Sequence, residues 1–238
     1  MGQHVGTVVE LFRYPVKSMA GESVSSVVVD WQGIEGDRQF AFYGSADRSR
    51  FPWLTGRDVP EMVGYRAHFR DPEVPRHSSI EVATPDGQRL ALDGEPLRSR
   101  LAELAGTDVR LMQVGRGAYD AMPISLTTTA SSAALDAAHG VPLDRRRFRL
   151  NLIIESDAPE TGWRGKRLCF GGWNDSAEIL VADAIERCVM ITIDPDSTER
   201  EPAIMKLVAN EFDNRVGVYA APSKPGLIRR GDAVTIVD

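Results

Sequence analysis

Cysteine is scarce in this chain, because the 238 residues include only Cys169 and Cys188. Two thiols are too few for a disulfide framework, and too few for a zinc or iron–sulfur site built from thiolates alone. Each cysteine therefore has to be judged from its own neighbours in the sequence.

Long hydrophobic runs are also absent. No segment approaches the roughly 18 apolar residues of a transmembrane helix, and Met1–Thr7 lacks the basic and apolar stretches of a secretory signal. We therefore expect a cytoplasmic protein. The 34 acidic residues outnumber the 28 basic ones and give a net charge of -6. Because the molecule as a whole repels nucleic acid and anionic membranes, an anionic ligand must bind at a local group of basic residues.

The common nucleotide and hydrolase motifs are missing too. The sequence has no Gly-x-Gly-x-x-Gly after a strand, no phosphate loop, no His-Glu-x-x-His and no Gly-x-Ser-x-Gly. The four histidines show no metal-ligand spacing, and surface or turn positions are the usual setting for such residues. These absences remove support from the most familiar enzyme classes.

Short β-rich runs separated by turns dominate what is present. A content of 42% hydrophobic and 26% charged residues is ordinary for a soluble globular protein. Many short strands with few helices predict a mainly β protein with a few short helices (α+β), whose strands close or nearly close into a barrel. The predicted strands are 7–12, 24–29, 38–43, 65–69, 80–83, 89–92, 109–114, 149–154, 167–170, 179–182, 188–193, 216–220 and 233–237.

Three segments have helical rather than alternating spacing. An irregular stretch that starts at Gly115 separates the first helix from the others, and it predicts a boundary between domains 1–116 and 117–238. The first helix covers 97–104 and stops at Gly106, the second runs from a cap at Thr128 or Thr129 to Gly140, and the third starts near Pro202.

Two turns in the first part of the chain present groups suited to an oxyanion. In Tyr14–Met19 a strand runs into a turn that places Lys17 beside the hydroxyl of Ser18. In the second turn, two glycines precede Arg38, whose guanidinium can grip an oxyanion with two parallel hydrogen bonds. A turn in which Arg38 simply pairs with Asp37 explains the second segment equally well.

A basic run, Arg145–Asn151, enters what we predict to be a buried strand. A solvated basic face accounts for its first three arginines. Arg149 and Asn151 alternate onto one face of that strand, and they need polar partners if that face points inward.

Cys188 follows Arg187 at the predicted start of a strand. A neighbouring cation stabilises a thiolate, and the thiolate is the form of cysteine that binds soft metals. From the local chemistry alone, however, a cysteine in an apolar strand is more often a small core residue.

Several motifs, taken together and in order, resemble the MOSC family with its N-terminal β-barrel domain. The pattern is similar to the mitochondrial amidoxime-reducing component and its bacterial counterparts, which reduce N-hydroxylated compounds at a molybdenum centre. The motifs cover nearly the whole chain, so their combination is far more specific than any single one. They are Tyr14–Ser18, Gly36–Arg38, Phe148-Arg149-x-Asn151, Arg187-Cys188 followed by Thr192-x-Asp194-Pro195, Gly217–Tyr219 and Gly231-Asp232.

The resemblance implies an N-terminal β-barrel-like domain, a MOSC β-barrel domain, and a molybdenum–molybdopterin cofactor between them. It implies that Cys188 is the metal ligand and the catalytic residue of an oxidoreductase, independent of pyridoxal phosphate, that reduces N-hydroxylated or N-oxide compounds. A separate flavin or iron–sulfur protein would donate the electrons, because this chain lacks the cysteines for a cluster. The residues that would hold the pterin and its phosphate are Lys17, Ser18, Arg38, Arg149, Asn151 and Tyr219.

The chain departs from the family pattern at five positions, and two alternatives to an enzyme stay open. Met19 replaces a common cysteine and Leu150 a common proline, Ala121 and Met122 lack expected hydroxyls, and Glu186 is acidic where a small polar residue is common. One alternative is a molybdenum-cofactor or sulfur carrier that presents Cys188 without turnover. The other is a degenerate MOSC scaffold that binds no cofactor.

Overall fold

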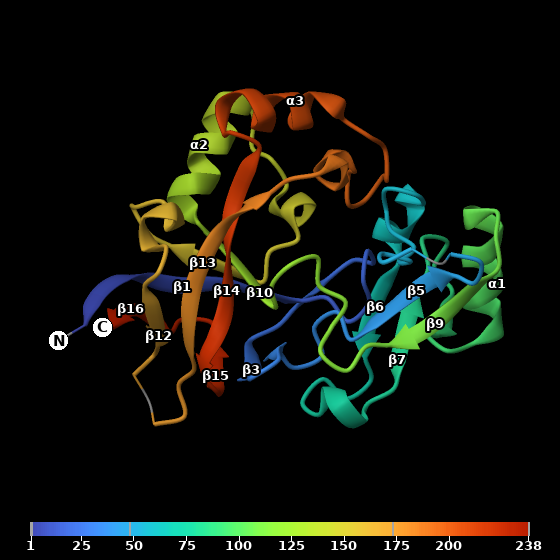
Figure 1. The fold of residues 1–238 in the computed structure, drawn as a ribbon, viewed down its shortest axis with the longest axis horizontal. Coiled ribbons are helices and arrows are strands. Elements are labelled where there is room, and N and C mark those ends of the chain that lie inside the picture. The colour runs from blue at the N-terminus through green and yellow to red at the C-terminus, as the bar shows by residue number, and fades with distance from the viewer. Residues whose placement is uncertain (1, 48, 173, 238) are drawn as a thin grey trace.

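The computed structural model describes residues 2–47, 49–172 and 174–237. Within these ranges a sheet in the order β11-β10-β14-β13-β12-β16-β1 closes on itself, because β1 also pairs with β11. The result is a seven-stranded barrel, which confirms the predicted mainly β class with short helices (Figure 1). Its strands are β1 (Gln3–Arg13), β10 (Ile124–Thr128), β11 (Leu152–Glu155), β12 (Arg167–Phe170), β13 (Glu178–Glu186), β14 (Arg215–Lys224) and β16 (Ala233–Val237).

Apolar side chains that alternate along the strands fill the barrel. In β12, for example, Leu168 and Phe170 are buried whereas Arg167 and Cys169, on the opposite face, are only half-buried. Because successive side chains of a strand point to opposite faces, this alternation directs every second residue into the core. The barrel core includes Val8, Leu11, Leu126, Leu152, Leu168, Phe170, Val181, Val218 and Val234.

Two helices cover the outside of the barrel. Strands β10 and β11 are parallel and need a crossover, and α2 (Thr129–His139) lies within it. As predicted, α2 is capped by Thr128, whose hydroxyl accepts a hydrogen bond from the Ser131 N–H, and it ends at Gly140. The third helix, α3 (Pro202–Glu211), starts where predicted and lies beside α2 at the top of Figure 1.

A second unit with its own apolar core lies beside the barrel (Figure 1). This core contains Met19, Phe42, Met62, Phe69, Val82, Leu97, Leu101 and Val109. The unit is built from β5 (Phe40–Gly44) with β9 (Val109–Gln113), from β6 (Arg66–Phe69), β7 (Ile80–Ala83) and β8 (Arg89–Ala91), and from α1 (Glu95–Ala105) with the 3-10 helices η1 (Pro60–Gly64) and η2 (Pro75–His77).

The N-terminal segment contributes to both units, because Leu11 lies in the barrel core and Val16 and Met19 lie in the core of the second unit. Strand β1 is part of the barrel, and β3 (Ser26–Asp30) pairs with β15 (Gly226–Arg229) near the C-terminus. Strands β2 (Glu22–Ser23) and β4 (Gly33–Ile34) extend these two pairings. The domain boundary near residue 116 stays a prediction, and the strand pairings do not follow it.

One predicted strand starts too early and another is wrong, both at positions that matter for the site. Residues 145–148 form the 3-10 helix η3 (Arg145–Phe148), and Arg149 follows it with a φ of 53°, so β11 starts only at Leu152. Cys188 does not begin a strand but precedes the 3-10 helix η5 (Val189–Thr192). Apolar runs this short have the same composition in a strand and in a tight turn, and only the tertiary packing decides between them.

Candidate functional site

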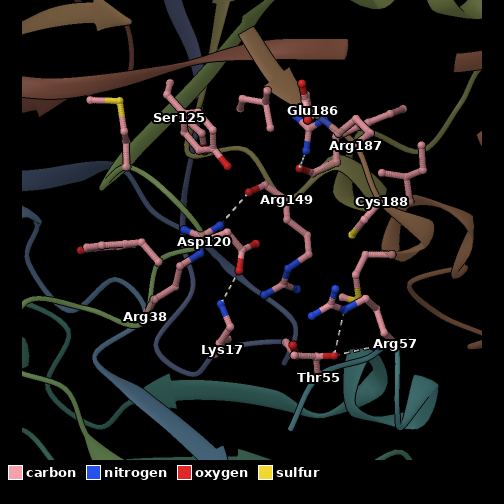
Figure 2. A pocket seen from close by; sticks show the side chains of 18 of the residues that line it. Lys17, Arg38, Thr55, Arg57, Asp120, Ser125, Arg149, Glu186, Arg187 and Cys188 are labelled. Carbon is pink, nitrogen blue, oxygen red and sulfur yellow. Dashed lines mark hydrogen bonds and ion pairs between the residues drawn. The ribbon is translucent and has the colours of Figure 1, made fainter. Parts of the chain in front are cut away.

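A pocket of about 490 Å³ is lined by residues from both parts of the chain (Figure 2). Six basic and two acidic side chains line it, so the pocket favours an anion although the whole protein carries a negative charge. All seven residues predicted for the site line this one pocket: Lys17, Ser18, Arg38, Arg149, Asn151, Cys188 and Tyr219.

Lys17 lines this pocket and is almost fully buried. The chain leaves β1 and turns at Ser18, whose φ is 66°, while the Lys17 N–H donates to the Phe40 carbonyl in β5. The Lys17 ammonium donates to the Ala118 carbonyl and to the Asp120 carboxylate, both at 2.7 Å. Burial lowers the pKa of Lys17, and the Asp120 carboxylate offsets part of that effect.

Arg38 makes the ion pair that one interpretation of its turn predicts, and it also lines the pocket. It pairs with the fully buried carboxylate of Asp37 and still lines the pocket. Its second amino group donates to the Arg149 carbonyl at 2.8 Å, which ties the two segments together. Gly36 makes the turn possible, because its φ is 84° and a Cβ there would lie 2.8 Å from the Phe69 ring.

Arg149 reaches the pocket from a left-handed turn rather than from a strand. It donates to the Met19 carbonyl at 2.7 Å. Its guanidinium lies 4.5 Å from the centre of the Tyr14 ring, and that of Arg38 lies 4.6 Å from the same ring. Burial lowers the pKa of Arg149 to about 10, so it stays charged at neutral pH. Tyr14 thus stacks against both cations.

Asn151 supports the site from beneath. Its side-chain oxygen accepts from the N–H and hydroxyl of Ser125, and its amide nitrogen donates to the Phe12 carbonyl and to Asp37. A carboxamide has two donors and two acceptor positions, and all four are used. Its contribution to the pocket is therefore to join Asp37 to the barrel strands.

The Cys188 thiol is exposed and lines the pocket. Its neighbour Arg187 donates to the carbonyls of Val216 and Phe148 and contributes charge rather than a hydrogen bond to the thiol. Burial lowers the pKa of Arg187 to about 10, against the opposing influence of Tyr219 and Cys188. An exposed thiol beside a fixed cation is suited to bind a soft metal ion.

The remaining predicted positions divide into pocket lining and packing. Tyr219 is half-buried on β14, and burial raises its pKa. Met19 and Leu150, two of the departures from the family pattern, are packed in apolar cores. Met122 and Glu186 line the pocket.

The pocket also contains residues that the sequence did not single out. Asp120, Phe51, Thr55 and Arg57 line it beside the predicted set. Tyr14 lies within a predicted motif, but its role as a ring stacked on two arginines depends on a contact across 135 residues. No short-range pattern in the sequence signals these contacts.

The described residues contain neither a cluster of metal-ligating side chains nor a membrane-spanning helix. Among residues 2–47, 49–172 and 174–237, no group of three or more His, Cys, Asp or Glu side chains is placed to hold a metal ion. No helix in these ranges is long and apolar enough to cross a membrane.

The chain matches two family models. The MOSC domain model matches residues 107–235, and the model of the MOSC N-terminal beta barrel domain matches residues 5–122. The two matches overlap around the irregular stretch at Gly115, and the first covers more than half of the chain.

Comparisons with solved structures and curated proteins add the following. The crystal structure of the YuaD protein from Bacillus subtilis is similar at a TM-score of 0.53 and 13% identity, over 99% of this chain and 98% of that one. YiiM from Escherichia coli gives a TM-score of 0.43 at 13% identity, over 95% of this chain and 70% of that one. No curated protein matches the sequence significantly.

Proposed function

The chain belongs to the MOSC family, and from this premise we propose that it holds a molybdenum–molybdopterin cofactor through Cys188 and reduces N-hydroxylated or N-oxide compounds. The MOSC domain resembles the C-terminal domain of molybdenum cofactor sulfurases, which associates this family with that cofactor. The substrate class and the role of each residue are parts of the proposal.

One observation carries the proposal: a single pocket combines an exposed thiol with cations from three distant segments. Lys17, Arg38 and Arg149 line the same pocket, Arg38 donates to the Arg149 carbonyl at 2.8 Å, and both arginines act to lower the pKa of Lys17. A phosphate attracts such a group of cations, and a thiolate is a suitable ligand for molybdenum. The donor set therefore fits a group that carries a phosphate at one end and a soft metal at the other.

In this proposal the protein residues bind and orient. Cys188 makes the protein bond to the metal, Lys17, Arg38 and Arg149 hold the phosphate, and Tyr219 lines the space between them. The cofactor, when bound, supplies the two-electron redox chemistry together with its own further metal ligands. Ser18, which precedes the fully buried Met19, lines the phosphate end of the pocket.

The electron donor in this proposal is a separate flavin or iron–sulfur protein. The chain's two cysteines are too few to hold a cluster. We therefore expect turnover with dithionite or an added flavin or iron–sulfur donor. Activity of the purified protein with a nicotinamide alone contradicts this part of the proposal.

The test is to purify the protein from a host that makes the cofactor. We expect about one molybdenum per chain, pterin fluorescence after oxidation, and reduction of a simple N-hydroxylated compound when an artificial donor is added. Molybdenum and pterin without turnover indicate the carrier function instead. If the protein contains neither molybdenum nor pterin although the host loads other molybdenum proteins, cofactor binding is refuted. The remaining alternative is then the MOSC scaffold that binds no cofactor.

A further inference from the structure

Three of the six cations that line the pocket, Arg57, Arg147 and Arg187, have no task in the proposed function. Arg147 pairs with Asp194 at 2.7 Å and donates to the Thr192 carbonyl, so its charge is used within the fold. Arg187 is likewise committed to two carbonyls. Arg57 is the remaining cation. It is not one of the three proposed to hold the phosphate, and among the described residues its guanidinium has no ion-pair partner and no hydrogen bond to a backbone carbonyl.

Arg57 carries an available charge at the pocket surface. Within the part of the chain that the structure describes, no carboxylate pairs with it, and its side-chain hydrogen bond is a long one, 3.4 Å to the Thr55 hydroxyl. The carboxylate next in sequence, Asp58, is bound instead by the hydroxyl and N–H of Thr55 at 2.8 and 3.1 Å. The Arg57 guanidinium is therefore free to bind an anion.

The turn that carries Arg57 is held in place. Its backbone carbonyl accepts a hydrogen bond from Arg200 at 2.9 Å, and the Arg57 guanidinium lies 5.3 Å from the centre of the Phe51 ring. The same ring also contacts Lys17, whose ammonium lies 5.1 Å from the ring centre. A cation held against an aromatic ring loses less side-chain freedom when a ligand binds.

Arg57 lies close to the proposed metal ligand. A Cβ on Gly56 would come within 2.9 Å of the Met190 sulfur, so the turn of Arg57 packs directly on the turn that follows Cys188. In the view of Figure 2, Arg57 and Cys188 lie on one side of the pocket, and Lys17 and Arg38 lie on the other. A ligand at Cys188 thus lies on the same side of the pocket as Arg57, and Arg149 lies between that side and the side of Lys17 and Arg38.

We propose that Arg57 determines substrate specificity by binding a carboxylate of the substrate. A single guanidinium matches the geometry and the single charge of a carboxylate, whereas a doubly charged phosphate suits the group of three cations formed by Lys17, Arg38 and Arg149. The substrate class is then an N-hydroxylated or N-oxide compound that also bears a carboxylate. The reaction in this inference rests on the proposed function, whereas the binding of a carboxylate by Arg57 does not depend on it.

A matched pair of ligands tests the inference. The probes are N-hydroxybenzamidine with a para carboxylate and the same compound with a para methyl group, titrated calorimetrically into the cofactor-loaded protein without an electron donor. For the wild type we expect the carboxylate compound to bind about five- to tenfold more tightly at low salt. We expect the preference to shrink as salt is added, because salt screens the pair.

The variants locate the effect. Arg57→Gln should remove the preference without weakening the methyl compound, and Arg57→Lys should retain part of it. Arg110→Gln is the control, since Arg110 is also an exposed arginine of the second unit but does not line the pocket. Equal affinities of the wild type for both probes, or a preference that survives in Arg57→Gln, overturns the inference.

Turnover of the two compounds then separates this inference from the proposed function. If both are reduced and kcat/KM shows no preference for the carboxylate, Arg57 does not select substrates and the inference fails. If neither is reduced but the binding preference depends on Arg57, the proposed reaction fails and the anion site stands.

Discussion

Asp120 places a negative charge in the region where, in the proposed function, the phosphate of the cofactor binds. Its carboxylate lies 2.7 Å from the Lys17 ammonium. Desolvation raises the pKa of Asp120. Lys17, and after it Arg38 and Arg149, lower that pKa by more, so it lies below its usual range. The carboxylate is therefore ionised at neutral pH and lies in the field of all three cations proposed to hold the phosphate.

Asp120→Asn should strengthen anion binding, because it removes this internal competitor while keeping the side-chain shape. Two unit charges near a protein surface interact by about 4 kcal/mol at 4 Å. The Asp120 side chain is 68% exposed, and solvent screening reduces such pairs to about 1 kcal/mol or less. That energy corresponds to a roughly fivefold gain in affinity.

The assay is a calorimetric titration with inorganic phosphate at neutral pH and low salt, on protein purified without cofactor. Glu186→Gln is the matched control, because Glu186 is the other carboxylate that lines the pocket and its nearest cation is Arg215 at 4.0 Å. We expect the control to change the affinity less than twofold. Phosphate binding that is unchanged or weaker in Asp120→Asn refutes the idea that this carboxylate competes for the anion site.

Four further variants test individual contacts. Cys188→Ser should abolish both the molybdenum content and the reductase activity while the circular dichroism spectrum stays unchanged, and full activity would show that another group binds the metal. Cys169→Ala should lower the free energy of unfolding by less than about 1 kcal/mol and leave activity intact, because the side chain is half-buried on the outer face of its strand. Asn151→Ala should destabilise the protein by about 3 kcal/mol in chemical denaturation, since it removes four hydrogen bonds, three of them buried; a loss below about 1 kcal/mol would show that those bonds matter little. Burial raises the pKa of Tyr14 to about 12, with Arg149 and Arg38 opposing; Tyr14→Phe should therefore remove the tyrosinate absorbance that appears near that pH, and a variant that loses absorbance near pH 10 instead would contradict the burial argument.

The limits of several elements follow from local signals that the sequence carries. The helix between Thr128 and Gly140 lies where its cap and its stop predict it, because a capping hydroxyl and a glycine with positive φ act within a few residues. The order of the motifs likewise sufficed to identify the MOSC family, which the family model confirms. The helix limits depend on residues that are close in the chain, and the family assignment depends on a motif pattern that needs no tertiary contact.

The basic residues of the site could be predicted from the sequence, but not their arrangement. Arg149 was expected on a strand because its neighbours are apolar, whereas the structure places it in a left-handed turn. Asn151 lines the pocket, as the resemblance implies, and the hydrogen bonds of its side chain within the protein could not be predicted from the sequence. Whether a polar side chain faces a ligand or a neighbouring strand depends on the packing around it.

By itself, therefore, the sequence determined the family, the helix limits and the cationic character of the site, since these depend on local preferences and on residue types. The tertiary structure decided which groups meet in the pocket. Lys17 meets Asp120 across 103 positions, and Arg38 meets the Arg149 carbonyl across 111. Such contacts form only when the barrel closes and the second unit packs beside it, because their partners share no local signal and are brought together by the burial of two separate apolar cores.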